Sequence, residues 1–502
     1  MLAACAVMAV AAGAVLRFWT VSDLWLDEAL TVNIASLPVA DIPRALRSDG
    51  LPPLYYVMLH FWMGLFGEGD VAVRSMSGVF SVATLPVAWL AGKRCGGPRV
   101  GVILVATVAS CPFLVRYATE ARMYSLLSLL VFCGWLVVSV MGERPRLGQV
   151  AAGAVVSGAL LLTHYWAAFL VASVVLVSGL AARNSDGARR RRLSAIALVS
   201  LAGSVFFLPW LPIFLDQLGS TGTPWAGPQR PLQMLAVTLG DLGGAGATSF
   251  RDGQIYGILL AFTMVVALTG RGTSDRTVEV GLRTVPGVRG ELAVAAVGFS
   301  IAAAVSWLTS SAYATRYASV FVPLLLLAAA VGIERTGRTG RAYLLPVVVL
   351  LGLAGSFYVA TRERTQAGVI AAEIAEHSAA GDLVVYCPDQ LGPAVHRLLQ
   401  RWRTNVREVV YHPRFLPPDR IDWVDYAERH ARTDPAGFAR RVRAEAGDWA
   451  IWLVHSPTYE GVGSVCDELV ALLGEGRRTV QVTRADGDRY FEHASLTKLE
   501  PL

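Results

Sequence analysis

Long apolar runs separated by short polar segments repeat along the first 360 residues of the chain. We place eleven of them at 2–18, 71–92, 100–116, 123–141, 149–163, 165–182, 193–215, 254–270, 291–309, 317–333 and 342–360. Several are shorter than the roughly 20 residues of a straight membrane span, so we expect their helices to extend into the flanking loops. The pattern predicts a polytopic α-helical membrane domain over 1–360.

The polar segment 19–70 between the first two runs contains an aromatic stretch at 52–66 that two prolines open. Prolines suit the start of a helix, and Tyr55, Tyr56 and His60 suit a helix that lies in the membrane interface. One more spanning helix here would invert every later loop. We therefore predict an interfacial helix in this first external loop, with these three side chains as candidates for acceptor contact.

After residue 360 the chain becomes charged and alternating. We predict strands at 382–387, 406–411, 449–455, 478–484 and 489–497, and helices near 393–403, 435–446 and 463–474. Alternating strands and helices indicate an external soluble α/β domain over 361–502, built around a largely parallel sheet. It carries no catalytic signature, so we expect it to bind or guide the acceptor, with a purely structural cap as the alternative.

Composition agrees with a membrane protein. Hydrophobic residues make up 54% of the chain and charged residues 16%, and the mean hydropathy is +0.49. The net charge of +6 does not indicate nucleic-acid binding, because the basic residues cluster between the apolar runs, where membrane orientation explains them. Nearly all of them are arginine, which is typical of a GC-rich bacterial genome.

The basic residues predict the orientation. Alternate loops are rich in them: Lys93, Arg94, Arg99, Arg144, Arg146, Arg183, Arg189, Arg190, Arg191, Arg192, Arg271, Arg276, Arg283, Arg289, Arg335, Arg338 and Arg341. Cytoplasmic loops carry such an excess, so we place the N-terminus inside and the C-terminal domain outside a bacterial inner membrane. The first run is not a cleavable signal peptide, because Arg17-Phe18-Trp19 is a poor cleavage site.

This orientation places every chemically suggestive motif on the external side. They are Asp27-Glu28, Pro52-Pro53-Leu54-Tyr55-Tyr56, Tyr117-Ala118-Thr119-Glu120-Ala121-Arg122-Met123-Tyr124, Thr163-His164-Tyr165 and Arg316-Tyr317. Loop residues without a common role would divide between the two faces. In order, spacing and shared face, these motifs resemble the polyprenyl-phosphate-sugar-dependent glycosyltransferases of the GT-C superfamily, in the branch related to protein O-mannosyltransferases and bacterial aminoarabinose transferases.

The resemblance implies catalytic roles for the acidic pair. Asp27 is the expected base that deprotonates an acceptor hydroxyl, and partial burial would make it a better base. Glu28 would orient Asp27, contact the acceptor or help to bind a metal. Glu120 is a second acid on the same face, either in the donor site or in an ion pair with Arg122 or Arg116.

Arginines and aromatic residues on that face are candidates for binding the sugar donor. The planar guanidinium fork suits the donor phosphate, and the first candidates to bind it are Arg122 and Arg316, followed by Arg116 and Arg74. The alternative for each is a side chain that only extends from a helix end to the membrane surface. The further candidates for phosphate or sugar contact are Tyr117, Tyr124, Tyr165, Tyr317 and His164. For these an interfacial aromatic belt, or a packing role for the histidine, is the competing interpretation.

No metal site can be identified from spacing. The sequence has no His-x-x-x-His or Cys-x-x-Cys pattern, so a divalent ion is expected only if Asp27, Glu28, Glu120 and His164 meet in space. There is also no Walker loop and no glycine-rich loop after a strand, which argues against nucleotide-driven transport and soluble nucleotide-sugar enzymes.

The resemblance, with which the chemistry of the residues agrees, implies a membrane glycosyltransferase. It would move one sugar, mannose first or arabinofuranose second, from a polyprenyl monophosphate to an external glycolipid, polysaccharide or protein. A lipid-linked-sugar flippase or other transporter is the alternative, and it predicts polar groups through the membrane midplane. A membrane-anchored binding protein would need only one or two spans.

Two of the six cysteines lie in the predicted external domain. Cys387 ends its first strand and Cys466 lies near the start of its last helix. An oxidising compartment favours a disulfide between them, while two separate buried thiols are the alternative that the sequence leaves open.

Overall fold

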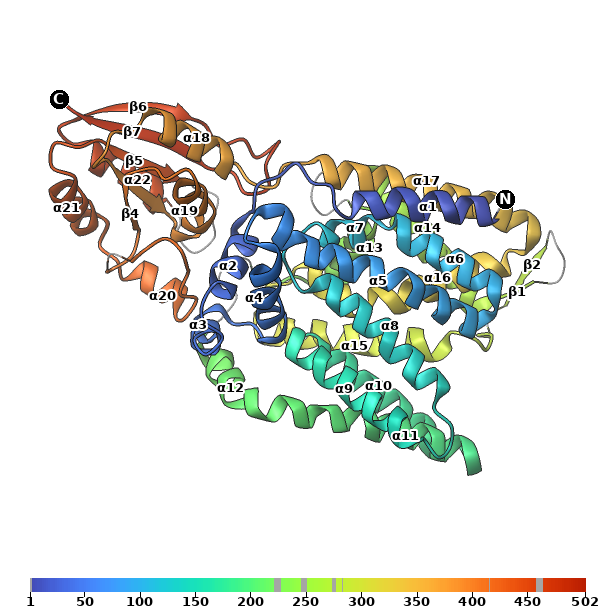
Figure 1. Ribbon diagram of the computed structural model, residues 1–502. Helices are drawn as coiled ribbons and strands as arrows, with labels where there is room; N and C mark the ends of the chain where they lie inside the picture. Colours follow the sequence, from blue (N-terminus) through green and yellow to red (C-terminus); the bar gives the residue numbers. More distant parts are fainter. Residues whose placement is uncertain are drawn as a thin grey trace.

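The computed structural model describes residues 2–220, 227–244, 251–272, 277–281, 283–414, 416–456 and 464–502. Figure 1 shows a bundle of helices with a smaller α/β unit packed at one end. The N-terminus lies at the opposite end of the bundle. We call the bundle end that carries residues 19–70 and the α/β unit the sheet-side end, and the opposite end, where the basic loops lie, the far end.

Several bundle helices have the length and composition to cross a membrane. In the described chain these are α5 (Asp70–Gly96), α15 (Arg289–Leu308), α17 (Gly337–Thr361) and the continuous helix Gly187–Ser220, made of α11 (Gly187–Ala202), η1 (Gly203–Trp210) and α12 (Leu211–Ser220). The pair α6 (Pro98–Ser110) and α7 (Pro112–Ala118) makes a fifth span if its 57° bend is allowed. The chain is therefore a polytopic helical membrane protein.

Shorter apolar helices complete the bundle: α1 (Leu2–Leu16), α8 (Tyr124–Val140), α9 (Leu147–Thr163), α10 (Ala167–Arg183), α14 (Arg251–Thr269) and α16 (Val322–Arg335), which follows the short helix η3 (Thr315–Val320). Each of the eleven predicted runs falls on one or more of the bundle helices, and the number that cross the membrane stays a prediction. The sequence analysis missed α13 (Pro231–Leu242), because Gly240 and Asp241 cut its apolar run short.

The basic loops gather at the far end. Figure 1 shows there the turns that join α5 to α6, α8 to α9, α10 to α11 and α16 to α17. The hairpin of β1 (Gly270–Gly272) and β2 (Val278–Val280) lies at the same end. The structure thus separates the arginine-rich loops from the motifs at the sheet-side end, as expected for a protein with two different aqueous faces.

Pro112 explains the bend between α6 and α7, because a proline cannot continue the helical hydrogen-bond ladder. Arg17, fully buried after α1, donates to the freed carbonyl oxygens of Val108 at 2.8 Å and Ala109 at 2.7 Å. A buried guanidinium thus satisfies the broken end of α6. The bend directs α7 and the following turn, residues 119–123, toward the sheet-side end.

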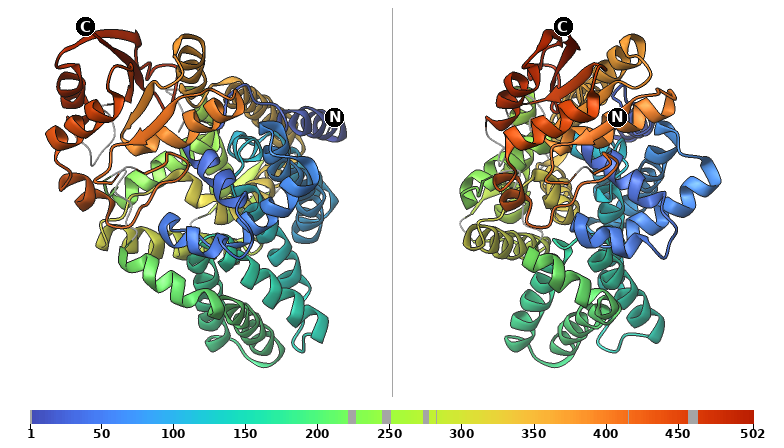
Figure 2. Two further views of the ribbon diagram at one scale, coloured as in Figure 1. Left: turned by 60° about the vertical axis from the view of Figure 1, so that its left-hand side comes forward. Right: turned by 90° about the vertical axis from the view of Figure 1, so that its left-hand side faces the viewer.

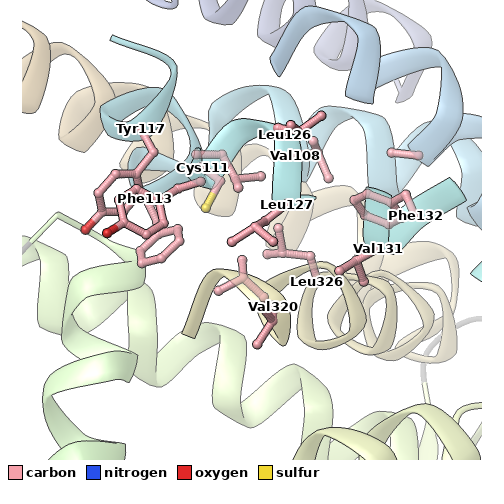
Figure 3. Close-up of a cluster of buried hydrophobic side chains, with 14 of the residues drawn as sticks. Val108, Cys111, Phe113, Tyr117, Leu126, Leu127, Val131, Phe132, Val320 and Leu326 are labelled. Atoms are coloured by element: carbon pink, nitrogen blue, oxygen red, sulfur yellow. The ribbon is translucent and has the colours of Figure 1, made fainter. Parts of the chain in front are cut away.

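The hydrophobic core beneath that turn is formed by α7, α8, η3 and α16. Figure 3 shows Phe113 and Tyr117 of α7 on one side of this cluster and Leu127 of α8 near Val320 and Leu326. All five side chains are 3% exposed or less. The turn that carries Glu120 and Arg122 therefore lies on a closely packed hydrophobic core.

Residues 19–70 form three short helices at the sheet-side end: α2 (Leu26–Ala35), α3 (Ile42–Asp49) and α4 (Leu54–Phe66). Helix α4 covers the stretch predicted as interfacial, and its position relative to a bilayer stays a prediction. It packs against α2 and α5. Figure 2 shows these blue helices next to the orange and red α/β unit.

The α/β unit follows α17. Its elements are α18 (Ala367–His377), β3 (Leu383–Cys387), η4 (Asp389–Leu391), α19 (Gly392–Arg401), β4 (Arg407–Val410), α20 (Tyr426–Ala431), α21 (Pro435–Ala446), β5 (Ile451–His455), α22 (Val465–Gly474), β6 (Arg477–Thr483) and β7 (Ser495–Pro501). The sequence analysis missed α18 and α20, and it began the last strand six residues too early.

The five strands have the order β4-β3-β5-β7-β6. Strands β4, β3 and β5 are parallel, while β7 pairs antiparallel with both β5 and β6. The expectation of a largely parallel sheet was therefore wrong for one half of it. The reason is that β6 and β7 follow each other without a helix between them, so the chain reverses direction.

Both faces of the sheet are covered. Helices α18 and α19 pack on one face with Val384, Tyr386 and Trp452, and α21 and α22 pack on the other with Leu383 and Leu453. A disulfide joins Cys387 of β3 to Cys466 of α22, with Cα atoms 5.4 Å apart. Helix α19 also contacts α2, so the α/β unit reaches the helix that carries the acidic pair.

Candidate active site

The acidic pair lies in the first turn of α2, at the junction of the bundle and the α/β unit. Successive helical residues point about 100° apart, so the two carboxylates face different neighbours. Asp27 retains 15% side-chain exposure, whereas Glu28 has none. The pair that the sequence presented as one unit therefore divides into an accessible acid and a buried one.

Glu28 is held from several sides. Arg74 of α5 donates to its two oxygens from Nε at 2.7 Å and Nη2 at 2.6 Å, and the backbone N–H of Ala121 donates to Oε1 at 2.8 Å. The Arg364 guanidinium lies 3.9 Å from Oε2. This bidentate, charge-assisted arrangement fixes α2 to α5 and to the turn 119–123. Glu28 has no exposed surface with which to touch an acceptor.

Asp27 lies between two guanidinium groups. Its Oδ2 is 3.3 Å from Nη2 of Arg316 and 3.7 Å from Nη2 of Arg122, and it accepts no hydrogen bond within the described residues. The Asp27 carbonyl accepts a hydrogen bond from the Thr31 hydroxyl at 2.7 Å. The backbone is thus fixed, while one carboxylate oxygen keeps a lone pair for a proton.

Arg122 is positioned by its neighbours on three elements. Its Nη1 donates to the Thr31 hydroxyl at 2.8 Å, and its carbonyl accepts from Ser77 of α5 at 3.0 Å. Ser77 in turn shares a 2.7 Å hydrogen bond with the Tyr55 hydroxyl. Tyr55 is therefore a buried support for the turn that carries Arg122.

The other predicted residues of α4 also have supporting places. The Tyr56 hydroxyl donates to Asp49 at 2.6 Å, and His60 Nδ1 lies 2.8 Å from the carbonyl oxygen of Ala35. Tyr55 and Tyr56 are fully buried. These contacts attach α4 to α2 and α3, and they leave the two tyrosines without a surface for an acceptor.

Arg316 reaches Asp27 from η3. Its guanidinium lies over the rings of Trp25, at 5.5 Å, and of its neighbour Tyr317, at 5.8 Å. Such stacking fixes the orientation of the guanidinium plane beside Asp27. Trp25 directly precedes α2, so α2 and η3 are joined at this point.

A row of rings lines the same site. The ring centroids of Tyr117 and Tyr124 are 4.8 Å apart, those of Tyr124 and His164 are 5.8 Å apart, and those of His164 and Tyr317 are 5.2 Å apart. In the described chain the buried Tyr124 hydroxyl and His164 Nε2 have no hydrogen-bond partner. Buried polar groups without partners are rare, so these two are suited to contact a ligand.

His164 is buried beside the two arginines of the site. Burial, with Arg122 and Arg316 nearby, lowers the pKa of His164 to about 3. Its Nδ1 accepts from the backbone N–H of Trp166 at 3.1 Å, so a neutral ring carries its proton on Nε2. The site therefore has a positive potential and a neutral N–H donor, which together suit an anionic ligand.

Glu120 belongs to a second group of charges behind the turn. Its Oε1 lies 3.5 Å from Nε of Arg116 and 3.8 Å from Nη1 of Arg364. Arg116 also lies 3.8 Å from Asp241 of α13. Arg116 thus has two acidic neighbours, whereas Arg122 and Arg316 both approach the same oxygen of Asp27. Glu120 is therefore an ion-pair partner of Arg116 rather than of Arg122.

Tyr165 lies apart from this cluster. Its hydroxyl donates to Gln217 of α12 and accepts from Nε1 of Trp210 at 2.9 Å. The structure thus brings together most of the predicted residues and separates Tyr165 from them. Sequence reasoning missed Arg364 and Asp241, although an acid inside an apolar stretch is a signal that could have identified Asp241.

The acids of the site do not form a metal centre. No group of three or more potential ligands lies together in the part of the chain that the structure describes. Asp27, Glu28 and Glu120 each lie beside at least two arginines, which repel a cation. The residues present therefore do not fit a divalent ion, and the chemistry proposed below contains no metal step.

Residues 51–213 match the family described as dolichyl-phosphate-mannose-protein mannosyltransferase. A search of curated protein sequences found no match. The family match includes α4, the turn 119–123 and His164, but not Asp27 or Arg316. It therefore covers about half of the site described above.

Solved structures resemble the whole chain. ArnT from Cupriavidus metallidurans in the apo state has a TM-score of 0.61 at 16% identity, over 98% of this chain and 97% of that chain. The same protein bound to undecaprenyl phosphate has a TM-score of 0.57 at 14% identity, with the same coverage. At these identities the resemblance establishes the fold.

Two further resemblances come from more distant relatives. The oligosaccharyltransferase AglB from Archaeoglobus fulgidus, in complex with an inhibitory peptide and a dolichol-phosphate, has a TM-score of 0.52 at 10% identity, over 95% of this chain and 72% of that chain. The arabinofuranosyltransferase AftD from Mycobacteria has a TM-score of 0.50 at 16% identity, over 99% of this chain and 40% of that chain. The chain therefore has the fold of these membrane enzymes, and its residues 51–213 match a mannosyltransferase family.

Proposed function

We propose that the protein transfers a single sugar from a polyprenyl monophosphate donor to an acceptor hydroxyl at the sheet-side end. The matched family is described by dolichyl-phosphate-mannose, and the similar ArnT and AglB structures contain undecaprenyl phosphate and dolichol-phosphate. These descriptions support a polyprenyl-linked donor. Mannose is the first candidate sugar, and arabinofuranose, which the name of AftD supports, is the second.

One observation carries the proposal: the partly exposed Asp27 carboxylate lies against the guanidinium groups of Arg122 and Arg316. Sugar transfer from a phosphate needs a base for the acceptor and cations for the leaving group within a few ångströms of each other. The positions of Asp27, Arg122 and Arg316 support both roles. Arginine suits a phosphate because its planar fork gives paired hydrogen bonds and keeps its charge.

The reaction can be written with these groups alone. An acceptor hydroxyl gives its proton to Oδ2 of Asp27, and its oxygen forms a bond to the anomeric carbon of the sugar. The bond between that carbon and the phosphate oxygen breaks, and its electron pair stays on the polyprenyl phosphate. Arg122 and Arg316 then neutralise the charge that develops on this leaving group.

Donor binding would also free the base. In the free enzyme the two arginines face the Asp27 carboxylate. A donor phosphate would attract the same guanidinium groups and leave the carboxylate open to the acceptor hydroxyl.

The ring-lined wall would hold the donor's polar part. The Tyr124 hydroxyl and the Nε2–H of His164 are buried, close to the two arginines, and unpartnered in the described chain. A phosphate or sugar oxygen would accept hydrogen bonds from them. Because His164 is neutral, it would act as a hydrogen-bond donor and not as a source of protons.

The membrane topology is part of the proposal. The arginine-rich loops at the far end support a cytoplasmic N-terminus, and the acidic site with the α/β unit would then lie outside a bacterial inner membrane. The disulfide in the α/β unit is in keeping with an oxidising compartment. The acceptor would be a glycolipid, polysaccharide or protein on that side, bound or guided by the α/β unit. A flippase is not favoured, because the acids and arginines of the candidate site gather at the sheet-side end of the bundle.

A donor assay tests this function. The purified protein in lipid nanodiscs would be given radiolabelled polyprenyl-phosphate mannose or polyprenyl-phosphate arabinofuranose, with an extract of cell-envelope glycans as acceptor. We expect label to leave the lipid fraction and enter the glycan or protein fraction for one donor. Movement of intact donor across a sealed vesicle, without cleavage of the sugar–phosphate bond, would instead show a transporter.

A further inference from the structure

Helix α2, which carries Asp27, begins without a capping side chain of its own. Trp25 occupies the N-cap position and cannot accept a hydrogen bond from the first free backbone N–H groups. An acid from the α/β unit takes this role, because both carboxylate oxygens of Glu492 lie 3.3 Å from the backbone nitrogen of Leu26. Glu492 is 466 residues further along the chain.

The backbone around Glu492 is held in place. Its N–H donates to the carbonyl oxygen of Arg364 at 2.8 Å, and its carbonyl oxygen accepts from the N–H of Gln366 at 2.9 Å. Gln366 also accepts hydrogen bonds from the backbone N–H groups of Asp486 and Ala494. The carboxylate therefore approaches α2 from a rigid support and not from a free loop.

The same support reaches the bundle a second time through Arg364. Its backbone N–H donates to the Ser22 hydroxyl at 2.9 Å, and its guanidinium donates to the carbonyl oxygen and hydroxyl of Thr119 at 2.8 and 2.6 Å. Ser22 lies just before α2, and Thr119 begins the turn that carries Arg122. The α/β unit thus contacts both segments that face each other across the site.

We propose that Glu492 is a positioning residue for the transfer reaction: as a cap supplied by the α/β unit, it sets the position of α2 and hence of the Asp27 carboxylate. This inference rests on the proposed function, in which Asp27 is the base. A negative charge at a helix N-terminus is stabilising, and a displacement of about 1 Å at a reacting group can cost about 100-fold in rate. Glu492 does not touch the reacting atoms itself.

The protonation state of Glu492 gives a readout that a purely structural residue lacks. Burial, together with the charges of Asp27 and Glu28, raises the pKa of Glu492 to about 7. Three arginines lie at the same junction: Arg74 and Arg364 approach Glu28, and Arg316 lies over the Trp25 ring. Above pH 7 the ionised cap binds the N-terminus of α2 more strongly and adds negative charge near Asp27, so turnover should rise with pH through about 7.

The test compares Glu492→Ala and Glu492→Gln in the full-length protein in nanodiscs. Alanine removes the acceptor oxygens, whereas glutamine keeps one oxygen for Leu26 but cannot ionise. We expect Glu492→Ala to lower kcat about tenfold or more, with the KM for the donor changed less than about twofold, because Arg122 and Arg316 stay in place. We expect Glu492→Gln to keep, across the whole pH range, the turnover that the wild type shows below pH 7, and so to lose the rise near pH 7.

Hydrogen exchange separates this inference from the proposed function. The backbone amides of residues 26–30 should exchange faster in Glu492→Ala than in the wild type and in Glu492→Gln, and this readout needs no substrate. Glu500→Ala, which changes an acid of β7 paired only with Lys498 in the described chain, is the matched control and should match the wild type. The inference would be overturned if Glu492→Ala had wild-type kcat and wild-type protection of the amides of residues 26–30. It would also be overturned if the rise of turnover near pH 7 persisted in Glu492→Gln and vanished in His493→Asn.

Discussion

At the scale of single residues, two adjacent acids have opposite environments. Asp27 and Glu28 differ by one position on α2, yet one retains exposure between two arginines and the other is completely buried against Arg74. The sequence analysis expected Asp27 to be the base and Glu28 to orient it, contact the acceptor or help to bind a metal. Helical geometry separates them, because neighbouring side chains on a helix do not share a face.

The two arginines beside Asp27 should control donor binding. Replacing Arg122 or Arg316 by alanine should weaken binding of a polyprenyl-phosphate sugar by about 10-fold or more, because a charge-assisted hydrogen bond to phosphate is lost. Lysine at either position should recover only part of this affinity, since it lacks the bidentate fork. Equilibrium binding of radiolabelled donor to protein in nanodiscs measures the effect.

Arg338→Ala is the matched control, because Arg338 is exposed in the first turn of α17, at the far end. Its donor affinity should equal that of the wild type. Unchanged donor affinity in both the Arg122→Ala and the Arg316→Ala variants would mean that the phosphate binds elsewhere.

At the scale of elements, the buried ion pair between Glu28 and Arg74 joins α2 to α5, and the Ala121 N–H joins both to the turn 119–123. These three segments are distant in sequence and carry different parts of the site. A fully hydrogen-bonded pair of this kind gives the junction one defined geometry, because either partner alone would be a buried, uncompensated charge.

Breaking that pair should destabilise the protein. Glu28→Gln or Arg74→Ala should lower the free energy of unfolding by about 3–5 kcal/mol, the range for removing one partner of a buried ion pair. Glu143→Gln, which removes the exposed partner of Arg191, should cost less than about 1 kcal/mol. Thermal unfolding in one detergent compares the three variants, and equal melting temperatures for Glu28→Gln and Glu143→Gln would contradict this account of the junction.

The sequence predicted those elements and residues that depend on local pattern. The apolar runs located the bundle helices, and Arg122, His164 and Arg316 were recognised from short motifs beside them. Arg364 and Glu492 could not be found in this way, because their roles arise only when the α/β unit folds back onto α2. Tyr165 was assigned to the donor site although its hydroxyl faces α12, since an adjacent position in sequence does not fix the direction of a side chain.

At the scale of the whole molecule, the α/β unit is attached to the sheet-side end of the bundle, where the candidate site lies. Glu492 and Arg364 contact the start of α2, and Arg364 also contacts the turn 119–123. Arg397 donates to the carbonyl oxygen of Glu68, just before α5. Acceptor binding by this unit and catalysis by the bundle would therefore share one interface. The disulfide between Cys387 and Cys466 fixes α22 to the sheet behind that interface.

The disulfide gives a test of the compartment as well as of the fold. After unfolding without a reductant, alkylation should modify Cys5, Cys95, Cys111 and Cys133, which are free thiols, but neither Cys387 nor Cys466. Addition of a reductant before alkylation should expose the last two. Mass spectrometry of the peptides distinguishes these states, and modification of both tail cysteines without reductant would show that the bond does not form in the membrane-inserted protein.

The most direct test of the central claim is a comparison of sugar transfer and donor binding in the wild type and Asp27→Asn. Asparagine has the same size but cannot take up a proton, so turnover should fall by about 10²–10⁴-fold while donor binding and the melting temperature stay close to the wild type. Transfer would be measured as radiolabelled sugar moved from polyprenyl phosphate to the acceptor at saturating donor. A turnover within about twofold of the wild type would contradict the assignment of Asp27 as the base, and with it the mechanism proposed for this protein.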